Sequence, residues 1–276
     1  MTRPEDQEVK EERGYKMKLE KIDGKGKKLK FIAEDTNPAM MNALRRTTMN
    51  YIPVLAIENV GIIENSSPVF DEIIAQRLGQ VPLVFDPDKF NMHEDCECEE
   101  GCSNCEVKFT LKGEGPGILY SGELNCKSGD VEVLYDRIPI TEMDENQEVD
   151  LEATACLSIG KDHSKHQASV SSYQYYPIID VDNDELTVEE KKSCQEICPR
   201  NVFELDGDKL NIENEERCTL CKECVEEVDS GVVVTGDEEK FIFKIESICS
   251  LDPEYIISKA AEVLEEKADK VVEKLS

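Results

Sequence analysis

The sequence lacks a long apolar segment. No stretch approaches the ~20 consecutive apolar residues that a membrane-spanning helix requires, and the N-terminus shows no apolar signal segment. We therefore expect a soluble, cytoplasmic protein without a membrane partner. With 276 residues, the chain has room for one large domain or for two to three small ones.

Basic residues are also in short supply. The chain has 32 Lys and Arg against 61 Asp and Glu, which gives a net charge of −29. Such a chain repels a phosphate backbone, so we expect little direct contact with DNA. An acidic surface suits basic protein partners, although acidity can equally serve solubility alone.

Groups suited to catalysis are sparse. The sequence has three histidines, and His163 and His166 lie in a polar loop without a nearby nucleophile or a second pair of ligands. This spacing fits neither a catalytic triad nor a zinc site and favours a solvated or partner-facing loop.

Cysteine, in contrast, is plentiful. The chain has 12 cysteines, most of them in two tight clusters, and in an intracellular protein this pattern indicates metal before disulfides. The first cluster has the spacing Cys96-x-Cys98-x3-Cys102-x2-Cys105. Four thiolates so close together can close a tetrahedron around Zn²⁺, and Gly101 lets the loop turn back. The alternative is a set of four unliganded surface thiols.

The second cluster consists of Cys194-x3-Cys198-Pro199 and Cys218-x2-Cys221-x2-Cys224. It resembles a bacterial-type ferredoxin segment, in which each iron–sulfur cluster takes three cysteines from one CxxCxxC run and a fourth from the Cys-Pro of the other. The ligands that this resemblance implies for one cluster are Cys198, Cys218, Cys221 and Cys224. The positions of a second set are Val188, Lys191, Cys194 and Val228. Because Cys194 alone of these can bind iron, we predict one cluster, [4Fe-4S] before [3Fe-4S], with zinc as the remaining alternative.

Residues 35 to 83 are predicted to form a helix, a strand and a second helix. Asn37 is a good N-cap and Pro38 suits the first helical position. Residues 54–60 are rich in β-formers. Ser67-Pro68 favours the start of another helix, which Gly79 is well placed to end.

Three ordered blocks in this region carry a family resemblance. They are Asn42–Arg46 (Asn-Ala-Leu-Arg-Arg), Val54–Ile57 (Val-Leu-Ala-Ile) and Asp71–Leu83. Together they closely resemble the assembly motif in the D-type subunit of archaeal DNA-directed RNA polymerase, a family similar to the bacterial alpha subunit and to the third-largest subunit of eukaryotic RNA polymerase II. The resemblance implies a non-catalytic platform on which the catalytic subunits of the polymerase are mounted. Some members of the family have the zinc loop and the ferredoxin-like insert.

The last segment is predicted to be a helix from Pro253 almost to Ser276. Its apolar residues recur at alternating steps of four and three, namely Ile257, Ala261, Leu264, Ala268, Val271 and Leu275. This heptad stripe suits packing against another helix, and the pattern alone fits an amphipathic helix on its own domain equally well. The resemblance favours a partner, the smaller subunit L. The further interface residues that it implies are Asn42, Leu44, Arg45 and Arg46.

The expected fold class is α+β, because short alternating strands such as 107–111 and 151–157 indicate a mostly antiparallel sheet. A disordered tail is expected at 1–13. Alternation of Leu19, Leu29 and Phe31 with charged residues around a turn predicts a β-hairpin at 15–34. A charged linker is expected at 182–192. The expected domains are a split dimerisation domain at 14–48 and 236–276, an inserted β-rich domain with the cysteine-rich loop at 49–180, and a ferredoxin-like iron–sulfur domain at 181–235.

Two rival functions remain open. A ferredoxin-type electron-transfer protein would explain residues 194–224 but leaves 42–83 unexplained. A free-standing zinc adaptor would explain the Cys96 loop and little else.

Overall fold

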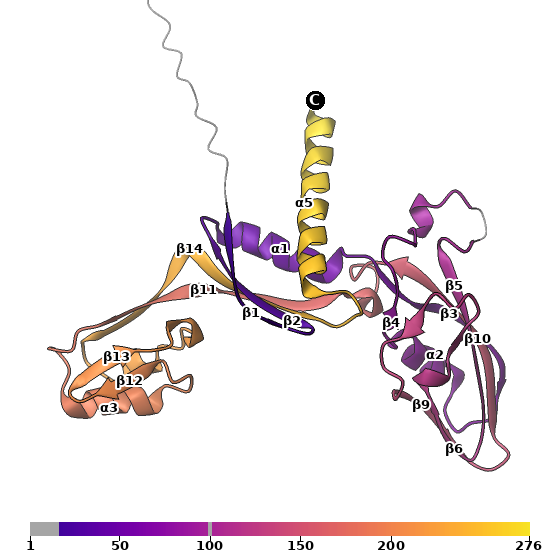
Figure 1. Ribbon diagram of the computed structural model, residues 1–276, viewed down its shortest axis with the longest axis horizontal. Coiled ribbons are helices and arrows are strands. Elements are labelled where there is room, and N and C mark those ends of the chain that lie inside the picture. Colours follow the sequence, from indigo (N-terminus) through magenta and orange to yellow (C-terminus); the bar gives the residue numbers. More distant parts are fainter. Residues whose placement is uncertain (1–16, 99–100) are drawn as a thin grey trace, which may run out of the picture. The chain divides into compact units, whose positions relative to one another are not determined.

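The computed structural model describes residues 17–98 and 101–276 (Figure 1). The predicted tail at 1–13 lies outside the described residues. The chain forms two compact units, each built from segments far apart in the sequence. The first contains the described residues up to Ile22, Phe31–Met41 and Gln174–Phe243, and the second contains Asp23–Lys30, Asn42–Tyr173 and Lys244–Ser276. Among the described helices, none is long and apolar enough to cross a membrane.

A four-stranded sheet has the order β1-β2-β14-β11, with β1 (Lys18–Lys25), β2 (Lys28–Glu34), β14 (Val232–Ser247) and β11 (Ser169–Val181). The predicted hairpin is confirmed in β1 and β2. Leu29 and Phe31 of β2 are buried, as the alternation indicated. The same alternation is wrong for Leu19, which is 53% exposed, because β1 is the edge strand and has no buried residue.

Helix α1 (Pro38–Asn50) begins where the sequence predicts. The side-chain oxygen of Asn37 accepts a hydrogen bond from the backbone N–H of Met40 at 3.0 Å. The buried residues of its inner face are Met41, Leu44, Thr47 and Thr48. The hydroxyl of Thr48 lies 2.9 Å from that of Ser171, which fastens α1 to β11. Met40 has a sequence spacing from Ala43, Leu44 and Thr47 that predicts it on the same face. It is 39% exposed, because the buried face is centred one residue later.

A second antiparallel sheet has the order β3-β10-β5-β7, with β3 (Val54–Asn65), β10 (Glu148–Ser158), β5 (Glu106–Glu114) and β7 (Asn125–Cys126). Inward residues of β10 alternate as predicted, with Leu151, Ala153 and Ala155 at most 1% exposed. Helix α2 (Asp71–Gly79) ends at the predicted glycine but begins after Phe70, later than Ser67-Pro68. Small strand pairs complete this region: β4 (Leu83–Val84) with β8 (Glu132–Val133), and β6 (Gly117–Tyr120) with β9 (Pro139–Met143).

The segment after β11 is a small folded insert. Its elements are α3 (Val188–Ile197), β12 (Phe203–Asp206), β13 (Lys209–Ile212) and the short helix α4 (Glu223–Glu226). The hydroxyl of Thr187 accepts from the backbone N–H of Glu190 at 3.3 Å, and the Glu190 carboxylate accepts from the Thr187 N–H at 2.8 Å. This capping box starts α3, so the expected charged linker at 182–192 is wrong from Val188 onward.

Helix α5 (Pro253–Leu275) has the predicted bounds to within a residue. Ile256 and Ala260 near its start are fully buried. From Lys267 to its end, every residue is exposed. Apart from Lys267, whose ammonium lies over the ring of Tyr51, the second half of α5 therefore makes little contact within this chain.

The core of the first unit depends on Phe243, so we predict the effect of truncating this side chain on the free energy of unfolding. The rings of Phe31 and Phe243 stack with centroids 5.1 Å apart, and Phe243 is fully buried. Phe243→Ala should lower the free energy of unfolding by about 3 to 5 kcal/mol, because it leaves a cavity between β2 and β14. Urea denaturation followed by circular dichroism measures the loss, since the chain has no tryptophan.

The control for that prediction is Val233→Ala on the same strand. Val233 is 56% exposed, so its truncation should change the free energy of unfolding by no more than about 0.5 kcal/mol. If the two variants lost equal amounts of unfolding free energy, the placement of Phe243 in the core would be contradicted.

Candidate functional site

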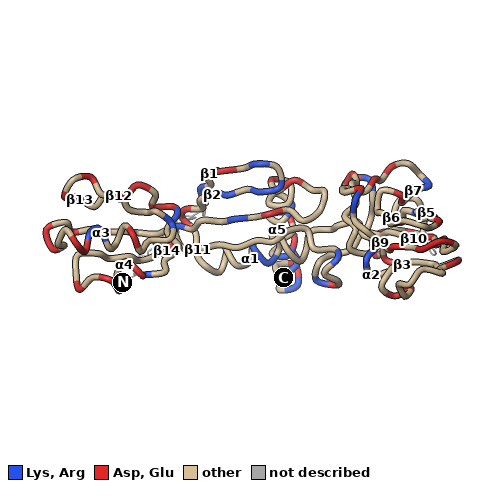
Figure 2. The backbone as a smooth tube through the Cα atoms, turned by 90° about the horizontal axis from the view of Figure 1, so that it is seen from below, with Lys and Arg blue, Asp and Glu red and all other residues tan. Residues whose placement is uncertain are grey.

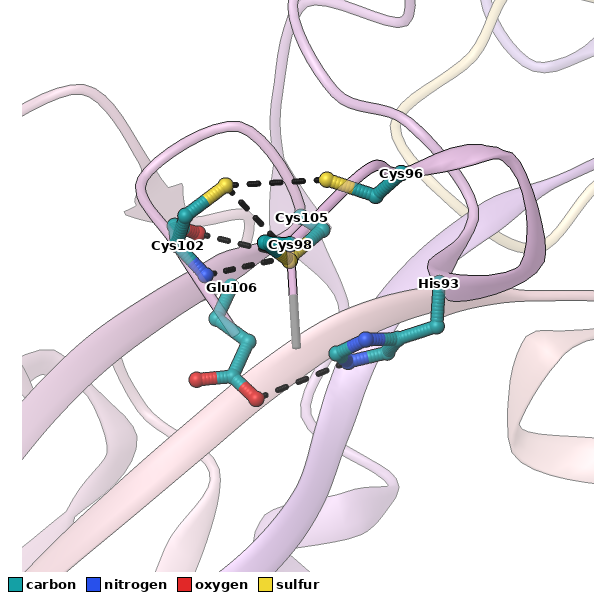
Figure 3. A network of polar contacts seen from close by, with 6 residues as sticks. All are labelled: His93, Cys96, Cys98, Cys102, Cys105 and Glu106. Atoms are coloured by element: carbon teal, nitrogen blue, oxygen red, sulfur yellow. Dashed lines mark hydrogen bonds and ion pairs between the residues drawn. The ribbon is translucent and has the colours of Figure 1, made fainter. Parts of the chain in front are cut away.

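The Cys96 loop gathers four thiols at one point between η1 (His93–Asp95) and β5 (Figure 3). Three sulfur pairs are close: Cys96 and Cys102 at 3.6 Å, Cys98 and Cys105 at 3.4 Å, and Cys102 and Cys105 at 3.8 Å. All four sulfurs lie within 4.8 Å of one another. Four sulfurs bound tetrahedrally to one ion at ~2.3 Å are ~3.8 Å apart. The loop therefore has the geometry for a single metal ion.

The backbone holds this loop closed. The carbonyl of Cys102 accepts hydrogen bonds from the N–H groups of Cys105 at 3.1 Å and Glu106 at 2.9 Å. Gly101 has φ +93, which favours glycine, and a Cβ at this position would collide with the side chain of Glu106. That carboxylate lies 3.5 Å from Nε2 of His93, so the glycine also makes room for a contact beside the thiols.

Two of these thiols differ strongly in acidity. Hydrogen bonding from the backbone of Asn104, and then from the thiol of Cys96, lowers the pKa of Cys102 to about 7. Burial raises the pKa of Cys105 to about 12. Cys102 therefore provides a thiolate near neutral pH, whereas Cys105 must lose a proton as a metal binds. Metal affinity at this loop should fall as the pH falls.

The second cysteine cluster surrounds a cavity instead of meeting at a point. Cys198, Cys218, Cys221 and Cys224 line a small cavity of about 20 Å³ that has apolar walls, including Val202. Within the described residues, these four thiols do not form a group as tight as the one at Cys96.

Local backbone geometry turns these thiols toward the cavity. Leu220 and Lys222, which alternate with the cysteines of the run, have φ of 58 and 63, a region that residues with side chains rarely adopt. Backbone N–H groups point at the sulfurs: Val202 donates to Cys198 at 3.5 Å, and Leu220 donates to Cys218 at 3.4 Å. Such hydrogen bonds stabilise thiolate ligands.

Three of the four residues at the positions of a second ligand set cannot bind iron, and the structure gives each of them another environment. Val188 is 45% exposed, and Val228 belongs to the insert's apolar core. The ammonium of Lys191 donates to the carbonyl of Asp208 at 2.8 Å. Cys194 is fully buried in the same core. These residues offer one thiol and no second set of ligands.

Contacts that the sequence did not predict fasten the cysteine run to β11. The side-chain amide of Gln174 donates to the carbonyl of Cys218 at 2.9 Å. The hydroxyl of Tyr176 donates to the carboxylate of Glu215 at 3.3 Å. Nothing in the spacing of these residues signals the contacts, because they join segments some forty residues apart.

The histidine loop differs from its predicted role. His166 is 1% exposed, and its Nδ1 lies 2.7 Å from the carbonyl oxygen of Val54. Lys165 pairs with Glu58 at 2.6 Å. The prediction of a solvated or partner-facing loop is thus wrong for His166, which pins the loop to β3, while His163 is exposed.

The predicted partner interface lies on α1 and α5. On α1, Leu44 is 4% exposed and belongs to this chain's own core, whereas Arg46 is exposed. Arg45 donates to the side-chain oxygen of Asn42 at 2.9 Å. Along α5 the stripe becomes more exposed toward its end: Ile257 and Leu264 are half-buried, Ala261 and Ala268 are exposed, Val271 is 57% exposed and Leu275 is 84% exposed.

Comparison with known proteins gives consistent matches. The family described as "RNA polymerase Rpb3/RpoA insert domain" matches residues 57–184. Three relatives, each named DNA-directed RNA polymerase subunit Rpo3, align along most of the chain. The relative from Methanosphaera stadtmanae is 40% identical over 251 residues, covering 88% of this chain and 92% of the relative. The relative from Methanothermobacter thermautotrophicus is 38% identical over 247 residues, covering 88% of this chain and 92% of the relative.

The third relative, from Archaeoglobus fulgidus, is 38% identical over 266 residues and covers 93% of this chain and 98% of its own length. These matches include the Asn42–Leu83 region and extend far beyond either cysteine cluster. The chain therefore belongs to the family of archaeal DNA-directed RNA polymerase subunit Rpo3, within the wider alpha/Rpb3 family.

Proposed function

We propose that this chain is the non-catalytic subunit on which DNA-directed RNA polymerase is assembled, and that it pairs with the smaller subunit L before the large catalytic subunits are mounted. The predicted class, a polymerase subunit that is not itself an enzyme, is confirmed by the named relatives. The alternative of an electron carrier is not favoured, because similarity extends along 88% of the chain and not only over the cysteine run. A cytoplasmic location and little direct DNA contact accompany this proposal.

The exposed half of α5 is the observation that carries the proposed pairing. Val271 and Leu275 project large apolar side chains that are 57% and 84% exposed. Full burial of such a side chain stabilises by about 1.5 to 3 kcal/mol, so a partner helix on this stripe gains free energy. Arg45 and Arg46 on α1 extend the proposed interface.

We propose that the chain is divided into three domains. Residues 14–48 and 236–276 form the dimerisation domain, 49–180 form the inserted β-rich domain, and 181–235 form the ferredoxin-like domain. The family match over residues 57–184 supports the second of these assignments.

We propose that Cys198, Cys218, Cys221 and Cys224 hold one [4Fe-4S] cluster, with [3Fe-4S] as the lesser option. The residues fit this group, because four thiols line one cavity with apolar walls and backbone N–H groups point at two of the sulfurs. A single zinc ion fits less well, since it would draw the sulfurs to ~3.8 Å from one another. A bound cluster would supply four covalent cross-links and redox-active iron to the insert.

The role proposed for these ligands is structural. The insert is small, and Cys218 and Cys224 lie within its apolar core, so ligation that ties Cys198 to the Cys218 run contributes to its folding. A relay usually profits from a second centre, and the second ligand positions hold Val188, Lys191 and Val228.

We propose that Cys96, Cys98, Cys102 and Cys105 hold Zn²⁺. Thiol spacings of 3.4 to 3.8 Å support a single tetrahedral ion at this loop. The proposed role is to close the loop next to β5.

The pairing is tested on exposed residues, so that the fold of the chain is left intact. Val271→Asp with Leu275→Asp should abolish the heterodimer, because burial of a charge in an apolar seam costs several kcal/mol. Size-exclusion chromatography of the chain co-expressed with the smaller subunit shows the outcome. The control is Glu273→Lys on the opposite face, which changes the net charge by as much and should pair normally. Retained pairing of the double variant would refute the interface.

The iron–sulfur assignment is tested at Cys221, the exposed member of the set. Cys221→Ser should lose the visible absorption of the cluster, unfold the insert locally and weaken docking of the large subunits, while pairing through α5 survives. Cys194→Ser is the matched control and should keep its iron, because Cys194 is no ligand. Normal polymerase yield from the cluster-free variant would contradict the structural role.

The zinc assignment is tested by metal analysis. Cys98→Ser with Cys102→Ser should release about one zinc per chain, since two ligands cannot retain the ion. Cys126→Ser, outside the loop, should leave the zinc content unchanged. An unaltered zinc content in the double variant would argue against the site.

A further inference from the structure

Two lysines lie over one aromatic ring in this otherwise acidic chain, and the charges of two further cations act on one of them. The ammonium of Lys267 on α5 lies 2.9 Å from the centroid of the Tyr51 ring, just beyond the end of α1, and that of Lys161 lies 5.7 Å from it. Lys270 follows Lys267 by one helical turn and shares its face. Arg46 lies near the end of α1, and its charge acts on Lys267. We call these four residues, Arg46, Lys161, Lys267 and Lys270, the cationic cluster.

The cationic cluster has no carboxylate of its own. Of the ion pairs found among the described residues, none involves its four members, although the chain has 61 Asp and Glu. In Figure 2, Lys and Arg segments are visible beside α1 and at the C-terminal end of α5. Burial, and then repulsion from Lys161, Arg46 and Lys270, lowers the pKa of Lys267. The ring of Tyr51 offsets part of this repulsion by a cation–π contact.

The cationic cluster adjoins the apolar stripe of α5. Lys267 directly precedes Ala268, and Lys270 directly precedes Val271. By the geometry of an α-helix, the two lysines lie along one flank of the stripe. A helix seated on Val271 and Leu275 would therefore bring its own flanking side chains to these lysines. Unpaired cations at the rim of an apolar surface call for anions on the molecule that covers it.

We infer that the cationic cluster binds carboxylates of the smaller polymerase subunit that pairs with α5. The inference rests on the proposed pairing and adds the chemistry of the partner: Asp or Glu side chains flanking its apolar face. A nucleic acid is the less suitable occupant, because the net charge of −29 repels a phosphate backbone at longer range.

The two parts of this surface have different tasks. Apolar contact along the stripe supplies affinity but tolerates sliding by one turn, since its residues repeat. Charge pairs at one flank fix which way the partner faces and speed its approach. The cationic cluster is thus a positioning element for the heterodimer.

Association kinetics with the smaller subunit test the inference. Lys267→Gln with Lys270→Gln should slow association by about tenfold at low salt, while dissociation changes little. At about 0.5 M salt, where the charges are screened, the variant and the parent should associate at similar rates. The control, Lys192→Gln with Lys209→Gln in the insert, removes the same charge from exposed positions and should match the parent at both salt concentrations. Circular dichroism checks that all variants remain folded.

A zero-length carbodiimide cross-linker, which joins amines to carboxylates, identifies the contact in the assembled pair. Mass spectrometry should find Lys161, Lys267 or Lys270 joined to Asp or Glu of the smaller subunit. Pairing of the parent without such links, and with a salt dependence equal to that of the glutamine variant, would overturn the inference while leaving the proposed pairing intact. A parent that does not pair at all would instead refute the proposed function. Salt-sensitive binding of labelled DNA or RNA that the glutamine variant loses would also overturn it, in favour of a phosphate ligand.

Discussion

Strand β14 is the element on which the rest of this chain depends. Its residues Phe241, Ile242 and Phe243 are all fully buried, so both faces of the strand are covered at this point. Its two neighbours in the sheet, β2 and β11, come from distant parts of the sequence. The cysteine insert precedes β14, and α5 follows it. The apolar burial of this strand therefore anchors the N-terminal hairpin beside it, the chain that leaves the insert and the chain that enters α5.

The two cysteine clusters use the same side chain for different purposes. At Cys96 the thiols touch one another, and a glycine with positive φ closes the loop. At Cys198 the backbone holds the thiols apart around a cavity, using left-handed conformations at Leu220 and Lys222. The backbone between the cysteines thus decides how closely the thiols of each cluster approach one another.

The sequence predicted what depends on local chemistry. The N-cap at Asn37, the end of α2 at Gly79, the start of α5 at Pro253 and the gathering of Cys96 with its three neighbours all rest on contacts within a few residues. The features that the sequence did not predict depend on contacts between segments far apart in the sequence. Burial of His166 depends on the Val54 carbonyl, and exposure of Leu19 depends on which strand forms the sheet edge. The contact of Gln174 with Cys218 and the position of Lys267 over Tyr51 had no local signal at all.

The two ends of the insert are joined by a hydrogen bond, in which the N–H of Asp182 donates to the carbonyl of Gly231 at 2.9 Å. The insert thus leaves β11 and returns to β14, strands that are already neighbours, at nearly the same point. A tight turn could join β11 to β14 across the short distance between the two ends of the insert. During evolution the insert can therefore be gained, lost or rebuilt without altering the sheet to which it is attached. Selection can then act on the chemistry of the cysteines separately from the assembly surface.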